Sequence, residues 1–561
     1  MKKTLLLLCL LSLFTQCDTN HSKGLRTNFT ISNNGTENTE KTGPKLMVGI
    51  VVDQMRYDYL VTFYNKYGKG GFKRLMREGY HLKNVHFNYI PTYTAVGHAS
   101  IYTGTVPANH GIIGNDWYDK SLQKEIYCVD DARYQTVGAK TGGEKSPHRM
   151  VTTTVTDQLK LAQNMRGKII GISLKDRAAI LPVGHTADAA YWFPGKDHGG
   201  FVTSTFYREQ LPQWVLDFNA SDKANTYLSQ RWETLYDIDS YTETLPDNNP
   251  YETAFKGKDS PTFPYDLAQL RKDNDNFDLL KNTPFGNSIV TDFSLAAIHG
   301  ENLGKTEATD FLSISYSSTD YIGHEFGVSS KELEDTYIRL DKELARLLES
   351  LDREVGQDNY TVFLTADHAV SHVPSYLQSL KIPAGYVNKE AFAAALNRIM
   401  KTHFNSTELI ENVSNYQIFL NKKKIRALGL DQHKVAQTIV DEIIQYKDVY
   451  KAVTAHTLQN THFDRGILQI LQNGYNQKRS GDVLLVPYPG TTPFYALTGT
   501  THGSGYNYDT HVPLIFYGAG VGKGHSNHYY SITDIAPTLS RILDITYPNG
   551  CTGRPIAEVL N

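Results

Sequence analysis

Short runs of β-branched and other apolar residues alternate along the chain with segments in which apolar residues recur at helical spacing. Six such runs cover residues 45–53, 168–174, 310–317, 360–367, 482–488 and 512–518. Short, mostly apolar runs of this length are typical of strands buried on both faces of a parallel sheet. Helical patterns between them include residues 331–355 and 532–543. Strands that alternate with helices predict an α/β fold, a doubly wound and mostly parallel sheet sandwiched by helices.

Two stretches interrupt this alternation. Residues 193–284 are rich in Asp, Asn, Pro and Tyr, as loops are, whereas residues 375–481 carry helices and short strands of their own. Long loops in compact α/β proteins are usually functional and often cover an active site. We therefore expect one catalytic domain over residues 45–561, with two insertions near its active site.

The N-terminus has the pattern of an export signal. Lys2 and Lys3 precede an apolar run over residues 4–14, which is shorter than the roughly 20 residues of a membrane span. Residues 1–17 thus predict export to the periplasm or cell envelope. Cys17 follows the apolar run, and two outcomes stay open: acylation as a lipoprotein anchor, or simple cleavage. Residues 18–44, rich in Asn, Thr, Ser and Lys, predict a flexible tether.

Composition narrows the function only slightly. The 561 residues are 40% hydrophobic and 20% charged, and 56 basic against 59 acidic residues give a net charge of −3. Such a balance gives no reason to expect a nucleic-acid partner. Cys128 and Cys551 follow Cys17, and whether they form a disulfide stays open, because nothing in the sequence shows that their Cα atoms come within about 7 Å.

Aspartates and histidines follow several of the predicted strands. The carboxyl ends of parallel strands form the ligand-binding edge of an open α/β sheet. Singly, such an Asp is usually a helix cap or turn residue, and such a His is usually solvated or packed in the core. Together they form the carboxylate and imidazole mixture that suits zinc, and their number suits two ions bridged by a substrate oxygen. The set is Asp53, Asp320, His324, Asp367, His368 and His502.

A strand-turn-helix pattern over residues 91–104 places a hydroxyl at its turn. This segment, TYTAVGHASIYTG, is one of seven ordered motifs, with VVDQMR, HGIIGND, SLKDRAAI, STDYIGHEFG, TADHAVSH and THGSGYNYDTHVP. In these motifs, over Leu46 to Ala557, the chain resembles the alkaline phosphatase superfamily and, within it, the PafA-type bacterial alkaline phosphatases with a threonine nucleophile. No C/S-x-P-x-R signature surrounds Thr94, which argues against the sulfatase relatives of that superfamily.

The resemblance implies a dinuclear zinc site. In it, one zinc is held by Asp320, His324 and His502, and the other by Asp53, Asp367, His368 and Thr94. Thr94 is the nucleophile that the resemblance implies, and zinc coordination favours its alkoxide. A phospho-threonine intermediate and the release of inorganic phosphate follow.

The resemblance further implies that Lys175, Arg177 and Asn115 contact the phosphoryl oxygens. Lys175 and Arg177, spaced i, i+2 after the run 168–174, would lie on one face if the strand continued. A monoester brings a dianion that needs such partners, whereas phosphodiesterase relatives lack the pair. The expected function is therefore an exported zinc phosphomonoesterase acting on small phosphate monoesters. Two alternatives remain: a phosphodiesterase or nucleotide pyrophosphatase in which Lys175 and Arg177 are solvated charges, and a non-catalytic surface lipoprotein.

Overall fold

The computed structural model describes residues 43–493 and 497–560. The predicted export signal, Cys17 and the tether up to residue 42 lie outside the described residues. Within the described ranges, no helix has both the length and the apolar character that a membrane crossing would need.

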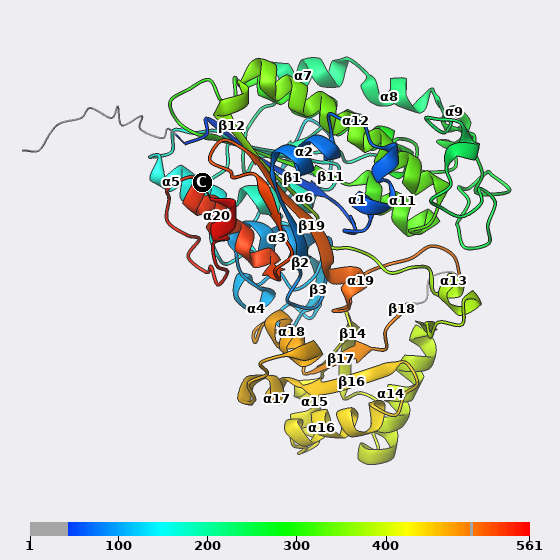
Figure 1. The fold of residues 1–561 in the computed structure, drawn as a ribbon. Helices are drawn as coiled ribbons and strands as arrows, with labels where there is room; N and C mark the ends of the chain where they lie inside the picture. The colour runs from blue at the N-terminus through cyan, green and yellow to red at the C-terminus, as the bar shows by residue number, and fades with distance from the viewer. Residues whose placement is uncertain (1–42, 494–496, 561) are drawn as a thin grey trace, which may run out of the picture. The chain divides into compact units, whose positions relative to one another are not determined.

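A nine-stranded sheet forms the centre of the body (Figure 1). Its strands follow the order β20-β2-β19-β12-β1-β11-β6-β7, with β21 paired to β2. The described pairings are parallel except those of β19, which runs antiparallel to both β12 and β2. The doubly wound, mostly parallel sheet is thus confirmed. Its strands are β1 (Leu46–Val52), β2 (Tyr80–His86), β6 (Ile169–Ser173), β7 (Ala189–Trp192), β11 (Asp310–Tyr316), β12 (Tyr360–Thr365), β19 (His511–Gly518), β20 (Gly524–Ser526) and β21 (Tyr530–Ser531).

Helices cover both faces of this sheet, and Figure 1 shows α12 on one side with α3 and α20 on the other. The layer that contains α12 includes α2 (Phe72–Glu78), α10 (Phe285–Gly300), α11 (Ser318–Phe326) and α12 (Lys331–Glu354). The opposite layer comprises α3 (Thr94–Thr103), α5 (Val155–Ala162), α6 (Asp176–Val183) and α20 (Ile535–Ile542). The helix predicted over residues 331–355 is α12: Ser330 caps it by accepting a hydrogen bond from the Leu333 amide, and Leu333, Tyr337, Leu340 and Leu344 supply its buried stripe.

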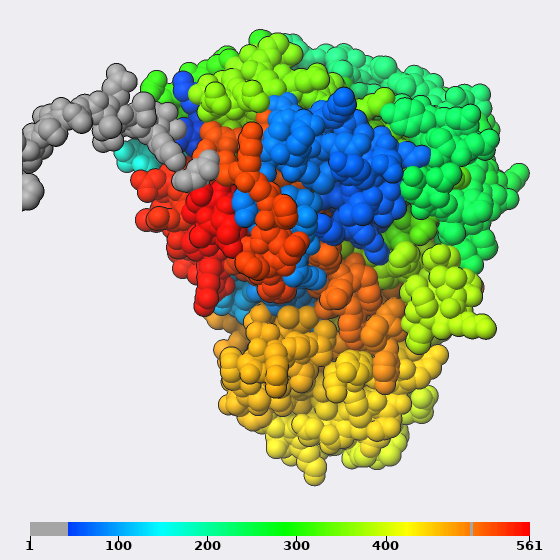
Figure 2. Space-filling model, viewed as in Figure 1, coloured from blue at the N-terminus to red at the C-terminus, as the bar shows by residue number. Residues whose placement is uncertain are grey.

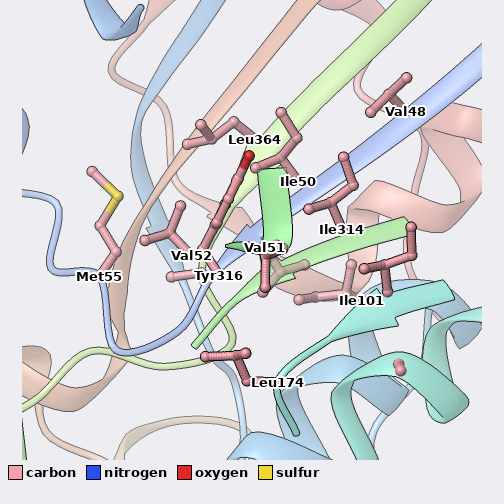
Figure 3. Packing of buried hydrophobic residues seen from close by; sticks show 14 of the residues in the cluster. Val48, Ile50, Val51, Val52, Met55, Ile101, Leu174, Ile314, Tyr316 and Leu364 are labelled. Carbon is pink, nitrogen blue, oxygen red and sulfur yellow. The ribbon is translucent and has the colours of Figure 1, made fainter. Parts of the chain in front are cut away.

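The core lies where the central strands meet these helices (Figure 3). Every residue of β1, β11 and β12 is buried, which explains why these segments are mostly apolar. Figure 3 shows Ile50, Ile314 and Leu364 from three adjacent strands packed together. Each such side chain contributes about 1.5–3 kcal/mol through burial. The core therefore fixes the strand ends that carry the polar side chains.

The first insertion is built from short elements. Its backbone also supports the loop that leads to His502, because the Gly499 amide donates to the Tyr251 carbonyl at 2.8 Å. Its elements are β8 (Thr203–Ser204), α7 (Gln213–Ala220), α8 (Lys223–Leu228), β9 (Arg231–Trp232), η2 (Ile238–Ser240), β10 (Tyr265–Asp266), α9 (Leu267–Leu270) and η3 (Phe277–Asn282).

The second insertion has its own four-stranded sheet, ordered β14-β15-β17-β16, and its own hydrophobic cluster. Figure 2 shows it, in yellow-green to orange, against the blue part of the body. Its elements are α13 (Pro374–Ser379), β13 (Gly385–Val387), α14 (Lys389–Phe404), β14 (Ile410–Ser414), β15 (Gln417–Leu420), α15 (Lys422–Ala427), α16 (Gln432–Ile443), β16 (Val449–Thr454), α17 (Ala455–Asn460), α18 (Gly466–Gly474), β17 (Val483–Pro487) and β18 (Thr491–Pro493).

The expectation that residues 482–488 join the central sheet was wrong. This run is β17, in the sheet of the second insertion. Val483 and Leu485 pack into one hydrophobic cluster, whereas Leu484 and Val486 pack into another. A strand buried on both faces has the same apolar pattern in either sheet, so periodicity did not distinguish them.

Short elements complete the body: α1 (Tyr59–Thr62), η1 (Tyr64–Lys66), α4 (Pro107–His110), β3 (Asp116–Asp119), β4 (Lys124–Tyr127), β5 (Thr136–Val137), η4 (Gln357–Asn359), α19 (Asn507–Thr510), η5 (Ile532–Asp534) and η6 (Ala557–Val559). The helix predicted over residues 532–543 is divided between η5 and α20. Cys128 is buried and Cys551 partly buried, and both are free thiols.

Candidate active site

Three carboxylates meet at the carboxyl edge of the central sheet. Asp53 directly follows β1, Asp320 lies in the first turn of α11 after β11, and Asp367 follows β12. The pairing of β1 with both β11 and β12 makes these three strand ends neighbours. Gln54, in a left-handed turn with φ 66°, links two of them. Its backbone N–H donates to Asp367 Oδ1 at 3.2 Å, and its side-chain Nε2 donates to Asp320 Oδ1 at 2.6 Å. All three carboxylates are buried.

Two histidines face Asp320. His324 Nδ1 donates to the Thr500 carbonyl and His502 Nδ1 to the Thr92 carbonyl, each at 2.7 Å. Because a carbonyl only accepts, these contacts place the Nδ1 protons and leave each Nε2 lone pair for a ligand. The two Nε2 atoms lie 3.1 and 3.5 Å from Asp320 Oδ1.

His502 reaches this edge by a route that the sequence did not indicate. The segment preceding it belongs to the second insertion, and His502 itself precedes β19. Because β19 is antiparallel to β12, its N-terminal end lies at the edge where the parallel strands end. The structure thus places His502 at this edge through β19, and not through the strand over residues 482–488 from which the sequence derived it.

His368 and Thr94 lie beside the other two carboxylates. His368 Nε2 is 3.5 Å from Asp53 Oδ1, 3.6 Å from Asp367 Oδ2 and 3.5 Å from Thr94 Oγ1. Thr94 is the first residue of α3 and its side chain is buried. Gly97 permits this approach, since a Cβ there would lie 2.0 Å from the Asp367 carbonyl oxygen. The turn therefore presents a hydroxyl directly to the polar cluster.

The sequence had not assigned site roles to three side chains that orient this cluster. His98 lies between the Thr94 carbonyl, at 2.9 Å from Nδ1, and Ser315 Oγ, at 3.0 Å from Nε2. Thr319 Oγ1 donates to the Asp53 carbonyl at 2.6 Å, and Gln54 bridges two aspartates as above. Each lies within a quoted motif, but no spacing in the sequence indicates these contacts between distant segments.

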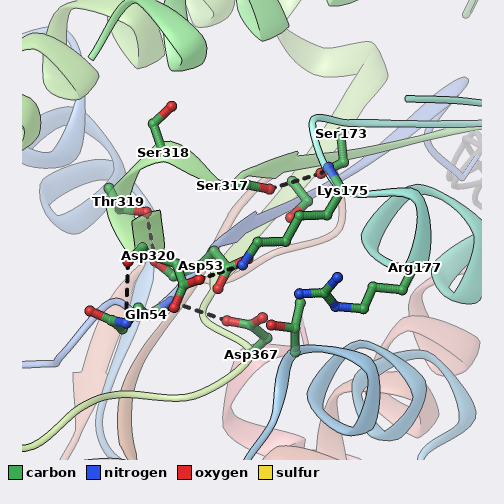
Figure 4. Close-up of polar contacts among 12 residues, drawn as sticks. Asp53, Gln54, Ser173, Lys175, Arg177, Ser317, Ser318, Thr319, Asp320 and Asp367 are labelled. Atoms are coloured by element: carbon green, nitrogen blue, oxygen red, sulfur yellow. Dashed lines mark hydrogen bonds and ion pairs between the residues drawn. The ribbon is translucent and has the colours of Figure 1, made fainter. Parts of the chain in front are cut away.

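Lys175 and Arg177 point toward the carboxylates (Figure 4). Lys175 Nζ lies 2.8 Å from Asp53 Oδ2 and 2.5 Å from Asp320 Oδ2. Arg177 Nη1 donates to Tyr127 OH at 2.9 Å, and its buried Nε has no hydrogen-bond partner among the described residues. The expected shared strand face was wrong, because β6 ends at residue 173 and the pair begins α6, with Lys175 as N-cap.

Asn115 lies beside the first turn of α3. Its Oδ1 accepts a hydrogen bond from the Ala95 amide at 2.9 Å. This contact orients the side chain and leaves the amide NH₂ as a donor next to Thr94.

The charge of the cluster makes a cation favourable. Burial raises the pKa of Asp53 well above its usual value, and the Asp367 carboxylate raises it further, although Lys175 opposes this. Burial also raises the pKa of Asp367, to about 7. Burial opposes ionisation of Asp320 too, but His324 and Lys175 outweigh it and hold its pKa well below the usual value.

Two carboxylate oxygens and two imidazoles have the properties that metal ligands need. Asp53 Oδ1 and Asp367 Oδ2 are buried without a hydrogen-bond partner among the described residues, a costly state unless a cation binds. Burial lowers the pKa values of His368 and His502, which favours neutral imidazoles able to donate a lone pair.

The ligand atoms form two adjoining groups, each within 4.8 Å: Asp320, His324 and His502, and Asp53, Asp320 and His368. Asp320 belongs to both. The second group has Asp320 where Asp367 was expected, although Asp367 Oδ2 is also close to His368. The structure thus gathers every predicted ligand in one place, and which of them hold a metal stays a prediction.

Comparisons with known proteins show the family to which the chain belongs. The profile of the type I phosphodiesterase / nucleotide pyrophosphatase family matches residues 47–511. Alkaline phosphatase PafA of Elizabethkingia meningoseptica is 44% identical over 92% of this chain and 94% of its own. Alkaline phosphatase PhoV of Synechococcus elongatus is 44% identical over 92% of this chain and 93% of its own. A Myroides odoratus protein named calcium-transporting ATPase is 43% identical over 94% of this chain and 96% of its own. The crystal structure of PafA superposes with a TM-score of 0.89 and covers 92% of this chain and 99% of that one.

The chain therefore belongs to the type I phosphodiesterase / nucleotide pyrophosphatase family of the alkaline phosphatase superfamily. Within that family it is a PafA-type member, which confirms the resemblance seen in its motifs.

Proposed function

We propose that this protein is an exported phosphomonoesterase with two zinc ions and Thr94 as nucleophile. The observation that carries the proposal is the meeting of a buried hydroxyl, carboxylates, imidazoles and two cationic side chains at one sheet edge. The similarity to two proteins named alkaline phosphatases supports the same activity. Carboxylate and imidazole together are the donors that suit zinc, and two adjoining ligand groups suit two ions.

Thr94 begins the reaction by attacking phosphorus from its position beside His368. When bound, zinc favours the Thr94 alkoxide and stabilises negative charge on the leaving oxygen. The P–O bond to Thr94 forms as the bond to the leaving alkoxide breaks, and water then hydrolyses the phospho-threonine to release inorganic phosphate. In-line displacement places the leaving oxygen opposite Thr94, and we assign it to the group formed by Asp320, His324 and His502, because Thr94 lies beside His368 of the other group.

Lys175, Arg177 and Asn115 supply donors for the non-bridging oxygens. A monoester dianion presents three such oxygens, and cations aimed at them stabilise the charge as the bond breaks. A solved PafA variant is described as substituted at a threonine, an asparagine, a lysine and an arginine. That threonine and asparagine are as far apart along the chain as Thr94 and Asn115, and that lysine and arginine are separated by one residue, as Lys175 and Arg177 are.

The name of the family favours a second candidate, a phosphodiesterase on the same scaffold. In a diester, one of these oxygens carries a carbon substituent in place of its negative charge. A diester therefore has less need of the two cations. The inward orientation of Lys175 and Arg177 argues for the monoester (Figure 4). A non-catalytic lipoprotein would need neither the hydroxyl nor the cations.

The deciding experiment compares kcat/KM for an aryl phosphate monoester with that for its methyl diester. Both are measured on zinc-loaded protein, with a chelated sample as control. A strong monoester preference that chelation abolishes supports the proposal. Diester preference replaces it with the phosphodiesterase, and no release of the aryl alcohol from either substrate refutes the enzyme.

Export through residues 1–17 is part of the proposal, and acylation of Cys17 is tested separately. Cells expressing the wild-type chain and a Cys17→Ser variant are fed a labelled fatty acid. Label on the wild-type protein alone supports a lipid anchor, and its absence from both supports simple cleavage.

A further inference from the structure

A cavity of about 430 Å³ lies between the body and the second insertion. Elements labelled in Figure 1 that contribute to its lining are α14, β14, β16, β17 and β18. Its walls are mostly apolar, with Val387, Phe392, Val413 and Leu485 from the insertion and Tyr93 from the body. A largely apolar cavity of this size is typical of sites for small organic molecules.

Tyr93 connects this cavity to the active site. It directly precedes Thr94, and its ring lies edge-on to the His502 ring, with 5.8 Å between centroids and 72° between planes. The backbone of Gly503 packs against the same ring, since a Cβ there would lie 2.5 Å from Tyr93 Cε1. The Tyr93 ring is therefore a shared wall of the cavity and of the group formed by Asp320, His324 and His502.

The direction of the reaction places the organic part of the substrate on this side. With the leaving oxygen assigned to the group formed by Asp320, His324 and His502, the organic part of the substrate lies near the His502 ring and so near the Tyr93 ring that contacts it. The cavity is the apolar space that begins at that ring.

Two polar atoms give the cavity a preferred ligand chemistry. Ser414 Oγ and Asp448 Oδ2 belong to residues lining the cavity, and both atoms are buried without a hydrogen-bond partner among the described residues. A buried carboxylate oxygen in this state is costly, and a ligand hydroxyl or amine would satisfy it.

We propose that this cavity is a leaving-group subsite that selects phosphate monoesters of aromatic ring alcohols carrying a hydrogen-bond donor at the far end of the ring. The proposal rests on the proposed phosphomonoesterase function and adds its substrate class. Apolar walls hold the ring, Tyr93 lies beside its phosphate end, and Asp448 accepts from its far end.

The apolar part is tested with Val413→Asp. Val413 is 41% exposed at the cavity wall, so the variant is expected to fold. Leu428→Asp is the matched control, because Leu428 is 47% exposed in the same insertion and is not among the residues lining the cavity. We expect Val413→Asp to lower kcat/KM for 2-naphthyl phosphate about tenfold, roughly 1.4 kcal/mol, and to change that for ethyl phosphate less than about twofold. Leu428→Asp should change neither.

The polar part is tested with 6-hydroxy-2-naphthyl phosphate against 2-naphthyl phosphate. We expect wild-type protein to prefer the hydroxylated ester about tenfold, as one charge-assisted hydrogen bond would give, and Asp448→Leu to lose that preference. Equal effects of Val413→Asp on naphthyl and ethyl phosphate, or a hydroxyl preference that survives Asp448→Leu, would overturn the subsite.

A binding measurement separates the subsite from the reaction. Fluorescence titration of 2-naphthol into zinc-loaded Thr94→Ala protein, with and without Val413→Asp, needs no turnover. Weaker binding in the double variant supports the subsite, and unchanged binding overturns it. If no monoester is hydrolysed by the wild-type protein, the proposed function fails, and this titration still decides whether the cavity binds the ring.

Discussion

Replacing Lys175 by Met tests whether this ammonium neutralises the carboxylates that metal ions would otherwise neutralise. Its Nζ contacts Asp53 and Asp320 at 2.8 and 2.5 Å, and its side chain is 2% exposed. Methionine keeps most of the length and volume and removes only the charge. Without zinc, the variant leaves two buried carboxylates without their cation. With zinc bound, the ions supply that charge.

The magnitude follows from burial. Removing one partner of a buried ion pair costs about 3–5 kcal/mol. The carboxylate can escape by binding a proton, but at pH 8 this is about 4 units above its ordinary pKa and costs about 5–6 kcal/mol. Leaving the carboxylate ionised and unpaired costs less free energy than protonating it. We therefore expect chelated Lys175→Met to lose about 3–5 kcal/mol of unfolding free energy. In zinc the loss should fall below about 1 kcal/mol, as for a substitution that breaks no pair.

The pKa shifts of Lys175 and of Asp320 together set the pH range in which their ion pair stabilises the protein. Burial alone would lower the pKa of Lys175, but Asp320 and Asp53 raise it above its ordinary value. The contribution of Lys175 to the free energy of unfolding is thus present at ordinary pH and is lost as pH rises through that raised pKa. The pKa of Asp320 is lowered, so its contribution is present above about pH 4 and is lost as pH falls through the lowered value. A pH of 8 therefore lies within the window.

Equilibrium unfolding in urea at pH 8, in chelator and in saturating zinc, measures the two free energies for wild-type and Lys175→Met protein. An equal loss in both conditions would refute the reasoning, because Lys175 would then be structural and unrelated to metal. No loss in chelator would show that the carboxylates are protonated there and that the ion pair does not exist.

Three further outcomes are expected. Thr94→Ala should lower turnover at least about a thousandfold, while metal analysis still finds two zinc ions per chain. Thr94→Ser should keep partial activity. Turnover near the wild-type value in Thr94→Ala would exclude Thr94 as the nucleophile. Arg177→Ala should lower monoester kcat/KM about a hundredfold, as loss of one transition-state donor does, and diester kcat/KM far less; equal losses would contradict its contact with the phosphoryl oxygens. Burial and the nearby Glu332 carboxylate raise the pKa of Glu252 to about 10, so its stabilising effect is present below about pH 4 and is lost as pH rises toward 10. Glu252→Gln should thus match wild-type stability at pH 4 and exceed it by at least about 1 kcal/mol at pH 9, and a thermal-melt difference that does not change with pH would disprove this.

The layers of the fold, and the sheet edge at which the polar residues gather, could be predicted from the sequence. Strands such as β1 and β12 are mostly apolar because helices cover both faces of the sheet, and this pattern is local. Asp53 and Asp367 come just after those strands, so the rule that parallel strands end at one edge predicted that their carboxylates lie at that edge, and the pairing of the two strands made them neighbours. Motif resemblance added Thr94 and the two cations, which no periodicity indicates.

The tertiary structure alone decided strand direction, sheet membership and the contacts that orient each group. β17 has the apolar pattern of a central strand but lies in the insertion, and His502 reaches the site because β19 runs antiparallel. The cation pair begins a helix instead of extending a strand, and Gln54 joins carboxylates that are far apart in sequence. Periodicity records whether a residue is buried, because burial depends on the local element. It does not record which distant surface buries it, and that surface sets the geometry of the site and of the cavity beside Tyr93.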